Sequence, residues 1–345
     1  MLSFGPARCA LDFEAPGKRA GFVDLDHSDS EHAFSSIRVP IGVLVGGDGP
    51  TILLTAGNHG DEYEGQIVLR QLMTALAPNQ ISGRLIMMPA LNTPAMLDRA
   101  RVSPLDKGNM NRAFPGATDQ GPTRAIAGWV NEHLIAMADL ILDFHSGGTA
   151  TQYVDCAFLC RGDQPELDAD NLASAECFGA PHTMICPIGG PYSGDFDTAA
   201  YRQNTRFLSC ELGGMGTVSA SSLDHGWRGC LRLLCREGLI DSDLRDALGG
   251  DSQGAATTFL NITDGASLLT TDCHGLAEPH LVLAQEVEEG ALVATIHDVH
   301  RFGMIAGTLV APQSGLLAVR RRNPVVKPGD HLAMICSVID RADLT

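Results

Sequence analysis

Apolar and amphipathic segments alternate along the first 250 residues of the chain. Residues 38–45 and 51–56 are apolar runs on either side of the turn sequence GGDGP, and they predict two strands. Apolar side chains recur near a 3.6-residue period over residues 64–77, which predicts a helix. Similar patterns predict further strands over 83–89, 140–144 and 207–210, and further helices over 123–137, 165–179, 196–204 and 222–247. Strands that alternate with helices are typical of an α/β domain with a largely parallel sheet.

The pattern changes after a Gly-rich segment at residues 249–254. Short β-type runs separated by turns follow, so we expect an α/β domain over residues 1–250 and an all-β domain over residues 257–345. Within the second domain, VEEGALV at 287–293 and VKPGDHL at 326–332 are each a charged turn followed by an apolar strand. This pair of similar turns predicts a barrel-sandwich-like module.

Composition narrows the range of partners. The 345-residue chain carries 24 Lys plus Arg and 41 Asp plus Glu, which gives a formal net charge of −17. Such a charge repels phosphate backbones and anionic lipid, so we expect neither nucleic acid nor a membrane as a partner. No apolar run approaches the roughly 18 residues of a membrane helix, and the start of the chain lacks a signal-peptide pattern. Ten cysteines without a C-x-x-C pair indicate reduced thiols in a cytoplasmic protein.

The strongest chemical signal is the segment GNHGDEYEG at residues 57–65, directly after a predicted buried strand. It spaces His59 and Glu62 as H-x-x-E, and a loop at the end of a strand can turn both side chains toward one point. His145, at the end of another predicted strand, can supply a third ligand. Two histidines and one glutamate with an open fourth position are typical of catalytic zinc. A bare H-x-x-E is more often structural, so this prediction depends on the surrounding motifs.

Four such motifs occur in order along the chain: GNHGDEYEG, RVSPLDKGNMNRAFPG, DFHSGG and ELGG. Together they resemble the succinylglutamate desuccinylase/aspartoacylase family, relatives of the zinc carboxypeptidases, over roughly residues 40–340. The resemblance implies a carboxypeptidase-like mixed sheet flanked by helices, followed by the C-terminal all-β domain. It also implies hydrolysis of a linear amide bond in a small N-acyl amino acid.

Residue by residue, the resemblance implies that His59, Glu62 and His145 hold one Zn²⁺ per chain and that Glu211 is the catalytic carboxylate. A carboxylate at that position would take a proton from water and deliver it to the leaving amine, a contribution of about 10²–10⁴ in rate. Asp143 lies two residues before His145, so both side chains face one side of the predicted strand. It either orients His145 or is an ordinary aspartate at the end of a strand.

A Pro-, Asn- and Gly-rich segment at residues 92–122 predicts a long ordered loop. Within it, Asn111 and Arg112 match the family's pair that binds the α-carboxylate of the substrate, a task for which the planar guanidinium suits Arg112. Arg101 matches the arginine that stabilises the oxyanion of the scissile carbonyl. Arg99 is a nearby competitor for that role.

The two motifs GNHGDEYEG and NMNRAFPG are most similar to those of family members that deacetylate Nα-acetyl-L-2,4-diaminobutyrate in ectoine breakdown. The cationic side chain of that substrate needs a carboxylate, for which Asp195 and Asp197 in the segment PYSGDFD are the candidates. Deacylation of succinylglutamate or acetylaspartate, cleavage of peptides, and a non-catalytic zinc-binding sensor or scaffold are the alternatives. For the oligomeric state, a homodimer and a monomer are both compatible with the sequence.

Overall fold

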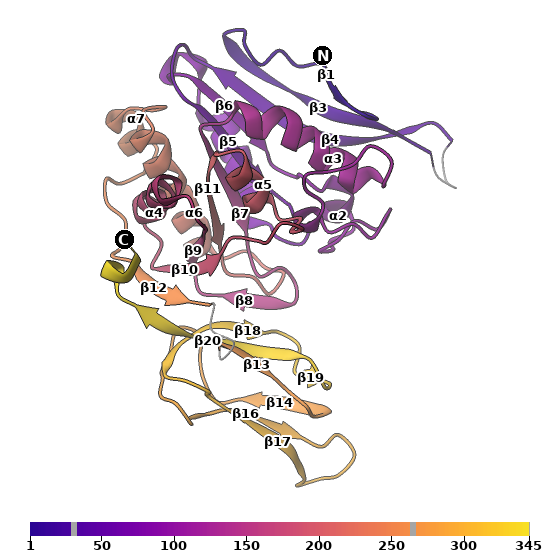
Figure 1. The fold of residues 1–345 in the computed structure, drawn as a ribbon, viewed down its shortest axis with the longest axis vertical. Coiled ribbons are helices and arrows are strands. Elements are labelled where there is room, and N and C mark those ends of the chain that lie inside the picture. The colour runs from indigo at the N-terminus through magenta and orange to yellow at the C-terminus, as the bar shows by residue number, and fades with distance from the viewer. Residues whose placement is uncertain (29–32, 263–266, 345) are drawn as a thin grey trace.

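The computed structural model describes residues 1–28, 33–262 and 267–344. An α/β body forms the upper part of the molecule in Figure 1, and strands from the C-terminal quarter form the lower part. The strands of the body are β1 (Leu2–Phe4), β2 (Ala7–Cys9), β3 (Gly17–His27), β4 (Ser35–Val45), β5 (Thr51–Ala56), β6 (Arg84–Met88), β7 (Leu140–His145), β8 (Thr151–Tyr153), β9 (Cys156–Arg161), β10 (His182–Pro187), β11 (Arg206–Glu211) and β12 (Thr258–Asn261).

Helices connect these strands, and most of them were predicted. The α-helices are α1 (Glu64–Ala75), α2 (Thr93–Leu97), α3 (Pro122–Trp129), α4 (Pro165–Phe178), α5 (Phe196–Arg202), α6 (Ala220–Arg236) and α7 (Ser242–Ala247). Shorter helical segments are η1 (Pro78–Gln80), η2 (Met110–Arg112), η3 (Val130–Leu134), η4 (Ile135–Met137) and η5 (Arg341–Leu344). The helix expected over 123–137 is the continuous run α3–η3–η4, and the one expected over 222–247 is two helices. No helix in the described residues has the length and apolarity needed to cross a membrane.

The central sheet is mixed, and its order through the body is β1-β2-β3-β4-β6-β5-β7-β11-β9-β10-β12. At its centre β5 pairs in parallel with β6 and β7, and β7 pairs in parallel with β11. The pairs β3–β4, β4–β6 and β9–β11 are antiparallel. Because β5, β7 and β11 are parallel neighbours, their carboxyl ends meet at one edge of the sheet.

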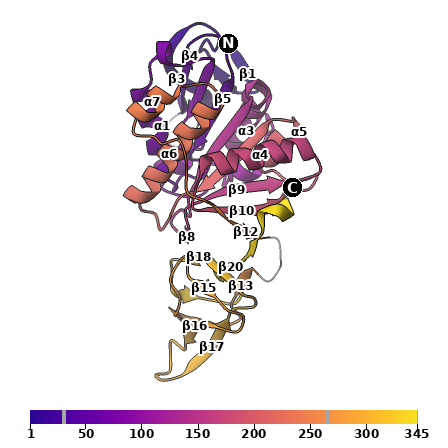
Figure 2. The ribbon, with the colours of Figure 1, turned by 90° about the vertical axis from the view of Figure 1, so that its left-hand side faces the viewer.

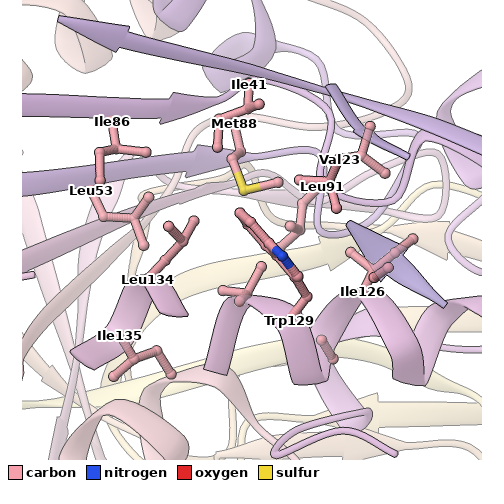
Figure 3. Close-up of a cluster of buried hydrophobic side chains, with 14 of the residues drawn as sticks. Val23, Ile41, Leu53, Ile86, Met88, Leu91, Ile126, Trp129, Leu134 and Ile135 are labelled. Atoms are coloured by element: carbon pink, nitrogen blue, oxygen red, sulfur yellow. The ribbon is translucent and has the colours of Figure 1, made fainter. Parts of the chain in front are cut away.

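Helices cover both faces of this sheet, with α1, α6 and α7 on one side and α3 and α5 on the other (Figure 2). Residues of β5 alternate between the faces as a pleated strand requires. Leu53 packs in the cluster that contains the fully buried Trp129 of α3 (Figure 3). Its neighbours Ile52 and Leu54 pack in the opposite cluster, with Leu72 of α1. Since β5 is buried on both faces, it holds the loop that follows it in a fixed place.

The C-terminal part is built of β13 (Leu268–Thr270), β14 (Gly275–Pro279), β15 (Glu286–Val287), β16 (Leu292–His297), β17 (Ile305–Val310), β18 (Gly315–Arg321), β19 (Val325–Val326) and β20 (His331–Ile339). Strand β20 pairs with β12 and β18 pairs with β8, so the sheet of the body continues into this part. The order β17-β16-β14-β19 forms a second sheet. Gly290 and Gly329 have positive φ in the two similar turns predicted from the sequence.

Several strands are not evident from the sequence pattern. Strand β3 alternates half-buried with exposed residues over most of its length, and β8 has three half-buried residues. Such strands lack the apolar run that reveals β5 or β7. The segment 92–122 is mostly loop, as expected, and contains α2, η2 and the first residue of α3. No helix or strand lies at residues 248–257 between α7 and β12, while the division into two domains there stays a prediction.

Candidate metal centre and active site

The loop after β5 carries two of the predicted ligands, His59 and Glu62. This loop lies close against the turn of α2, where a Cβ on Gly60 would approach the carbonyl carbon of Ala95 to 2.1 Å. Only glycine fits at that position without a shift of backbone. This close contact at Gly60 therefore fixes the path of the loop beside His59. The loop ends at Glu64, the first residue of α1.

The third predicted ligand, His145, is the last residue of β7. Because β5 and β7 are parallel neighbours, it lies at the same edge of the sheet as the loop after β5. Glu62 Oε1 lies 2.7 Å from His59 Nδ1, and Glu62 Oε2 lies 2.9 Å from His145 Nδ1. Each of the three residues offers one ligand atom within 4.8 Å of the others, and all three are buried. The structure thus brings together the three residues predicted to bind the metal.

The far nitrogen of each imidazole has its own partner. His145 Nε2 lies 2.8 Å from Asp143 Oδ2, and His59 Nε2 lies 3.1 Å from Asn109 Oδ1. Asp143 also accepts hydrogen bonds from the Thr55 hydroxyl at 2.6 Å and from the side-chain amide of an asparagine in the loop after β5. These contacts direct both Nδ1 atoms toward Glu62. Such outer partners commonly orient histidine ligands in metal sites.

Burial and close charges shift the pKa values of these groups. Burial acts to raise the pKa of the Glu62 carboxyl, but the charges and hydrogen bonds of His59 and His145 outweigh it and hold that pKa below its usual range. Burial lowers the pKa of His59. Burial also acts to lower the pKa of His145, but Asp143 and Glu62 outweigh it and raise that pKa. Glu62 is therefore an anion held between two imidazoles.

This donor set fits zinc, because two imidazole nitrogens and one carboxylate are among its preferred ligands in catalytic sites. The three side chains converge from the ends of two adjacent parallel strands, beside a cavity. That cavity has a volume of about 270 Å³ and is lined by His59, His145 and other polar side chains. Within the described part of the chain, His59, Glu62 and His145 form a group that could hold a metal ion.

Glu211, the predicted catalytic carboxylate, is the last residue of β11 and pairs in register with His145 on β7. It lines the same cavity as the two histidines. Its Oε2 is buried and has no hydrogen-bond partner among the described residues. Burial, together with the nearby negative charge of Glu62, raises the pKa of Glu211 to about 8. A carboxyl group with this pKa exchanges protons near neutral pH.

Three further predicted residues come from the long loop at 92–122. The Nη1 of Arg101 lies 3.4 Å from Glu62 Oε1, and Arg101 lines the cavity. Arg99 is exposed and does not line it, so the geometry favours Arg101. Asn111 and Arg112, in η2, both line the cavity.

The loop before α5 is held against η2. The Nη1 of Arg112 donates a hydrogen bond to Asp195, and the amide N–H of Phe196 donates to Asn111 Oδ1 at 3.0 Å. Asp195 therefore lines the cavity, with Arg112 as its partner. Asp197 lies on the same cavity wall.

Sequence reasoning missed several residues of the site. Asn109 is the first residue of the NMNR motif, two residues before Asn111. Its place in the motif could therefore have indicated its contact with His59. Tyr153 lines the cavity from the short strand β8, which had no apolar pattern to reveal it. Cys160 and Cys186 also line the cavity, with 2.7 Å between their sulfur atoms. They are 26 residues apart in the chain and become neighbours only because β9 and β10 pair in register.

Comparisons with known proteins match this fold and these motifs. The model of the succinylglutamate desuccinylase/aspartoacylase catalytic domain matches residues 48–235, which include all four of His59, Glu62, His145 and Glu211. The N-alpha-acetyl-L-2,4-diaminobutyric acid deacetylase of Halomonas elongata is 36% identical over 335 residues, which are 97% of this chain and 96% of that protein.

Two solved structures are similar over nearly the whole chain. The product-bound ectoine utilization protein EutE (DoeB) of Ruegeria pomeroyi has a TM-score of 0.91 and 32% identity, covering 97% of this chain and 99% of that one. A succinylglutamate desuccinylase of Silicibacter sp. TM1040 has a TM-score of 0.91 and 33% identity, covering 98% and 100%. The predicted fold, an α/β body with a mixed sheet and a C-terminal β part, is confirmed.

Proposed function

The chain belongs to the succinylglutamate desuccinylase/aspartoacylase family, and from this premise we propose that it is a zinc-dependent amidohydrolase that removes the acetyl group from Nα-acetyl-L-2,4-diaminobutyrate. The observation that carries the proposal is that His59, His145 and Glu211 line one cavity, while Glu62 lies against both histidines. The similarity to the Halomonas elongata deacetylase supports the choice of substrate.

In this proposal His59, Glu62 and His145 hold the zinc ion. When bound, zinc supplies a Lewis acid that polarises a carbonyl oxygen and brings the pKa of a coordinated water toward about 7. Asp143 and Asn109 keep the imidazoles oriented through their far nitrogens. The ligand carboxylate keeps its negative charge because its pKa is low.

Glu211 is the general base and then the general acid. It accepts a proton from the water that attacks the acetyl carbonyl, and it returns that proton to the amine nitrogen as the C–N bond breaks. Acetate and the free diamino acid are the products. Burial places the pKa of Glu211 near neutral pH, where a group can both take and give a proton efficiently. The unpartnered Oε2 leaves this carboxyl group free to act.

The loop at 92–122 supplies the groups that bind negative charge. Arg112 and Asn111 hold the α-carboxylate of the substrate, since a guanidinium carries five N–H donors and its contact with Asp195 occupies only part of them. Arg101 stabilises the negative charge that develops on the carbonyl oxygen. Its 3.4 Å distance from Glu62 places it beside the metal ligands.

We further propose that the protein acts in the cytoplasm, because no disulfide joins any of its ten cysteines. A homodimer stays a prediction. The cavity also bears on the alternative substrates, because the side chains of succinylglutamate and acetylaspartate are anionic. They would lie beside Asp195 and Asp197 on the cavity wall.

Acetate release from Nα-acetyl-L-2,4-diaminobutyrate tests the proposal, beside acetylaspartate, succinylglutamate and the Nγ-acetyl isomer. Each assay is run with zinc, with a chelator, and with the Glu211→Ala variant. We expect release from the Nα-acetyl diamino acid alone, dependent on zinc and abolished in the variant. Turnover of an acidic substrate instead would keep the mechanism and reject the substrate. No turnover by a zinc-loaded protein would favour the non-catalytic alternative.

A further inference from the structure

The cavity contains two aspartates on the wall formed by the start of α5, and their surroundings differ. Both oxygens of Asp195 have partners within the protein, since Oδ1 accepts from the Arg112 guanidinium and Oδ2 from the Ser193 hydroxyl. A cation thus already balances the charge of Asp195. This aspartate holds Arg112 in place and is poorly suited to bind a second cation.

Asp197 has no such balance. Its Oδ1 accepts hydrogen bonds from the amide N–H and the hydroxyl of Thr198. In the described part of the chain no Arg, Lys or His forms an ion pair with Asp197, whereas Arg112 forms one with Asp195, and the like charge of Asp195 acts on Asp197. Amide and hydroxyl donors are neutral, so they orient this carboxylate without cancelling its charge.

The space beside Asp197 is small, and apolar side chains form part of its wall. A recess of about 10 Å³ opens next to it, and Phe158, Cys160 and Phe207 line both this recess and the main cavity. A volume of roughly 10–15 Å³ holds one water-sized group, and an ammonium group is of that size. The aromatic rings suit a short methylene chain that leads from the main cavity to the recess.

We propose that Asp197 selects for substrates with a cationic side chain by accepting the side-chain ammonium group of the bound amino acid in this recess. The inference rests on the proposed function, because it assigns the side-chain end of the same substrate. Arg112 then binds the α-carboxylate, the metal ligands and Glu211 face the acetyl group, and Asp197 binds the third polar end.

The test compares two substrates that differ only in charge. Nα-acetyl-L-2-aminobutyrate lacks the side-chain amine of Nα-acetyl-L-2,4-diaminobutyrate and is otherwise the same. For Asp197→Asn we expect kcat/KM to fall about 10- to 100-fold with the diamino substrate, the range for loss of a charged hydrogen bond, and less than about threefold with the uncharged analogue. Asp195→Asn is the matched control. It should lower kcat/KM by the same factor with both substrates, because it acts through Arg112.

A binding measurement and a second variant complete the test. Calorimetry with L-2,4-diaminobutyrate should show weaker binding to Asp197→Asn than to the wild type, at unchanged zinc content. Asp197→Glu keeps the charge one methylene further into the cavity, so it should shift preference toward the shorter Nα-acetyl-L-2,3-diaminopropionate. An equal loss with both acetyl substrates, or no shift in Asp197→Glu, would overturn the inference alone. Wild-type protein that fails on the diamino substrate would overturn the proposed function and the inference with it.

Discussion

Glu62 is the residue on which the geometry of the centre depends, because each of its carboxylate oxygens faces one histidine. It is 3% exposed and its pKa is lowered, so it stays anionic inside the protein. A buried anion needs close positive or polar partners. The two imidazoles and Arg101 supply them in this structure, and a metal cation would be a stronger partner at the same place.

Glu211 lies outside this ligand group, so its replacement should separate catalysis from metal binding. For Glu211→Gln we expect kcat to fall about 10²–10⁴-fold, the range for loss of general acid–base catalysis, with unchanged zinc per chain by elemental analysis. Glu166→Gln, at an exposed position in α4, is the control and should keep full activity. Loss of zinc together with activity would place Glu211 among the ligands instead.

Asp143 should act on zinc affinity through His145, whose Nε2 it contacts at 2.8 Å. We expect Asp143→Asn to weaken zinc binding about 10- to 100-fold, as replacement of such outer partners commonly does. Competition with a chromophoric chelator measures the affinity. The control is Asp139→Asn, beside the opposite end of β7, where Asp139 accepts from the Thr51 amide. Equal zinc affinity in the two variants would contradict a role for Asp143.

The residues of the site that could be predicted are those that lie in short sequence motifs. The H-x-x-E spacing of His59 and Glu62 and the position of His145 at the end of a strand could be recognised because each lies directly after an apolar run. The contact of Arg112 with Asp195 could not, because 83 residues separate them and only the fold brings two loops together. Long-range side-chain contacts of this kind have no local pattern.

Helix α6 illustrates how one element is anchored at its first turn. Ser219 caps it by accepting from the Ser222 amide, and Asp155 accepts from the Ser222 hydroxyl at 2.8 Å. Asp155 also lies 2.7 Å from His225 Nδ1. Asp155 comes directly before β9, so these bonds attach α6 to the strand that pairs with the end of β11. Sequence reasoning placed α6 within three residues of its observed start but gave no indication of this attachment.

This anchor should depend on pH. The hydrogen bond and charge of Asp155 raise the pKa of His225 above its usual 6.5. The stabilisation from the charged pair is therefore complete below pH 6.5 and is lost as the pH rises through the folded-state pKa. We expect Asp155→Asn to lower the free energy of unfolding by about 1 kcal/mol at pH 6, a modest value because His225 is 37% exposed in its side chain.

Urea unfolding of both proteins at pH 6 and pH 9 measures this effect. The difference between wild type and Asp155→Asn should be smaller at pH 9, because His225 is then neutral and loses its charge–charge attraction to Asp155. When His225 is first replaced by Gln, the destabilisation caused by Asp155→Asn should be nearly the same at pH 6 and pH 9. A difference that grows with pH would contradict the assignment.

At the scale of whole elements, the sequence predicted those with strong patterns and missed those that depend on pairing. Strands β5 and β7 are buried along their whole length and β11 at Phe207, Leu208 and Cys210, and all three were predicted within one or two residues. Strand β8 has only three half-buried residues and exists because β18 lies beside it. A strand stabilised by a partner more than 150 residues away leaves little trace in its own sequence.

The same pairing connects the two parts of the molecule. We propose that residues 1–250 and 257–345 are two domains that communicate through β8. On one side, β8 pairs with β18 of the C-terminal part. On the other, the amide of Tyr153 donates to the carbonyl of Gly213, two residues after Glu211, at 2.9 Å. The C-terminal part contributes no side chain to the cavity within the described residues, yet it supports a strand that forms part of its wall.

Arg320 offers a way to test this connection, because its Nε donates a 2.8 Å hydrogen bond to Gln152 Oε1 across the β8–β18 pair. Loss of one such bond, worth about 1 kcal/mol, should loosen β8 and with it Tyr153 at the cavity wall. For Arg320→Ala we expect KM to rise about two- to fivefold with a smaller change in kcat. Arg301→Ala is the control, since Arg301 pairs with Asp298 in the turn between β16 and β17. Steady-state kinetics in which the two variants behave alike would show that the C-terminal part does not support the cavity through this bond.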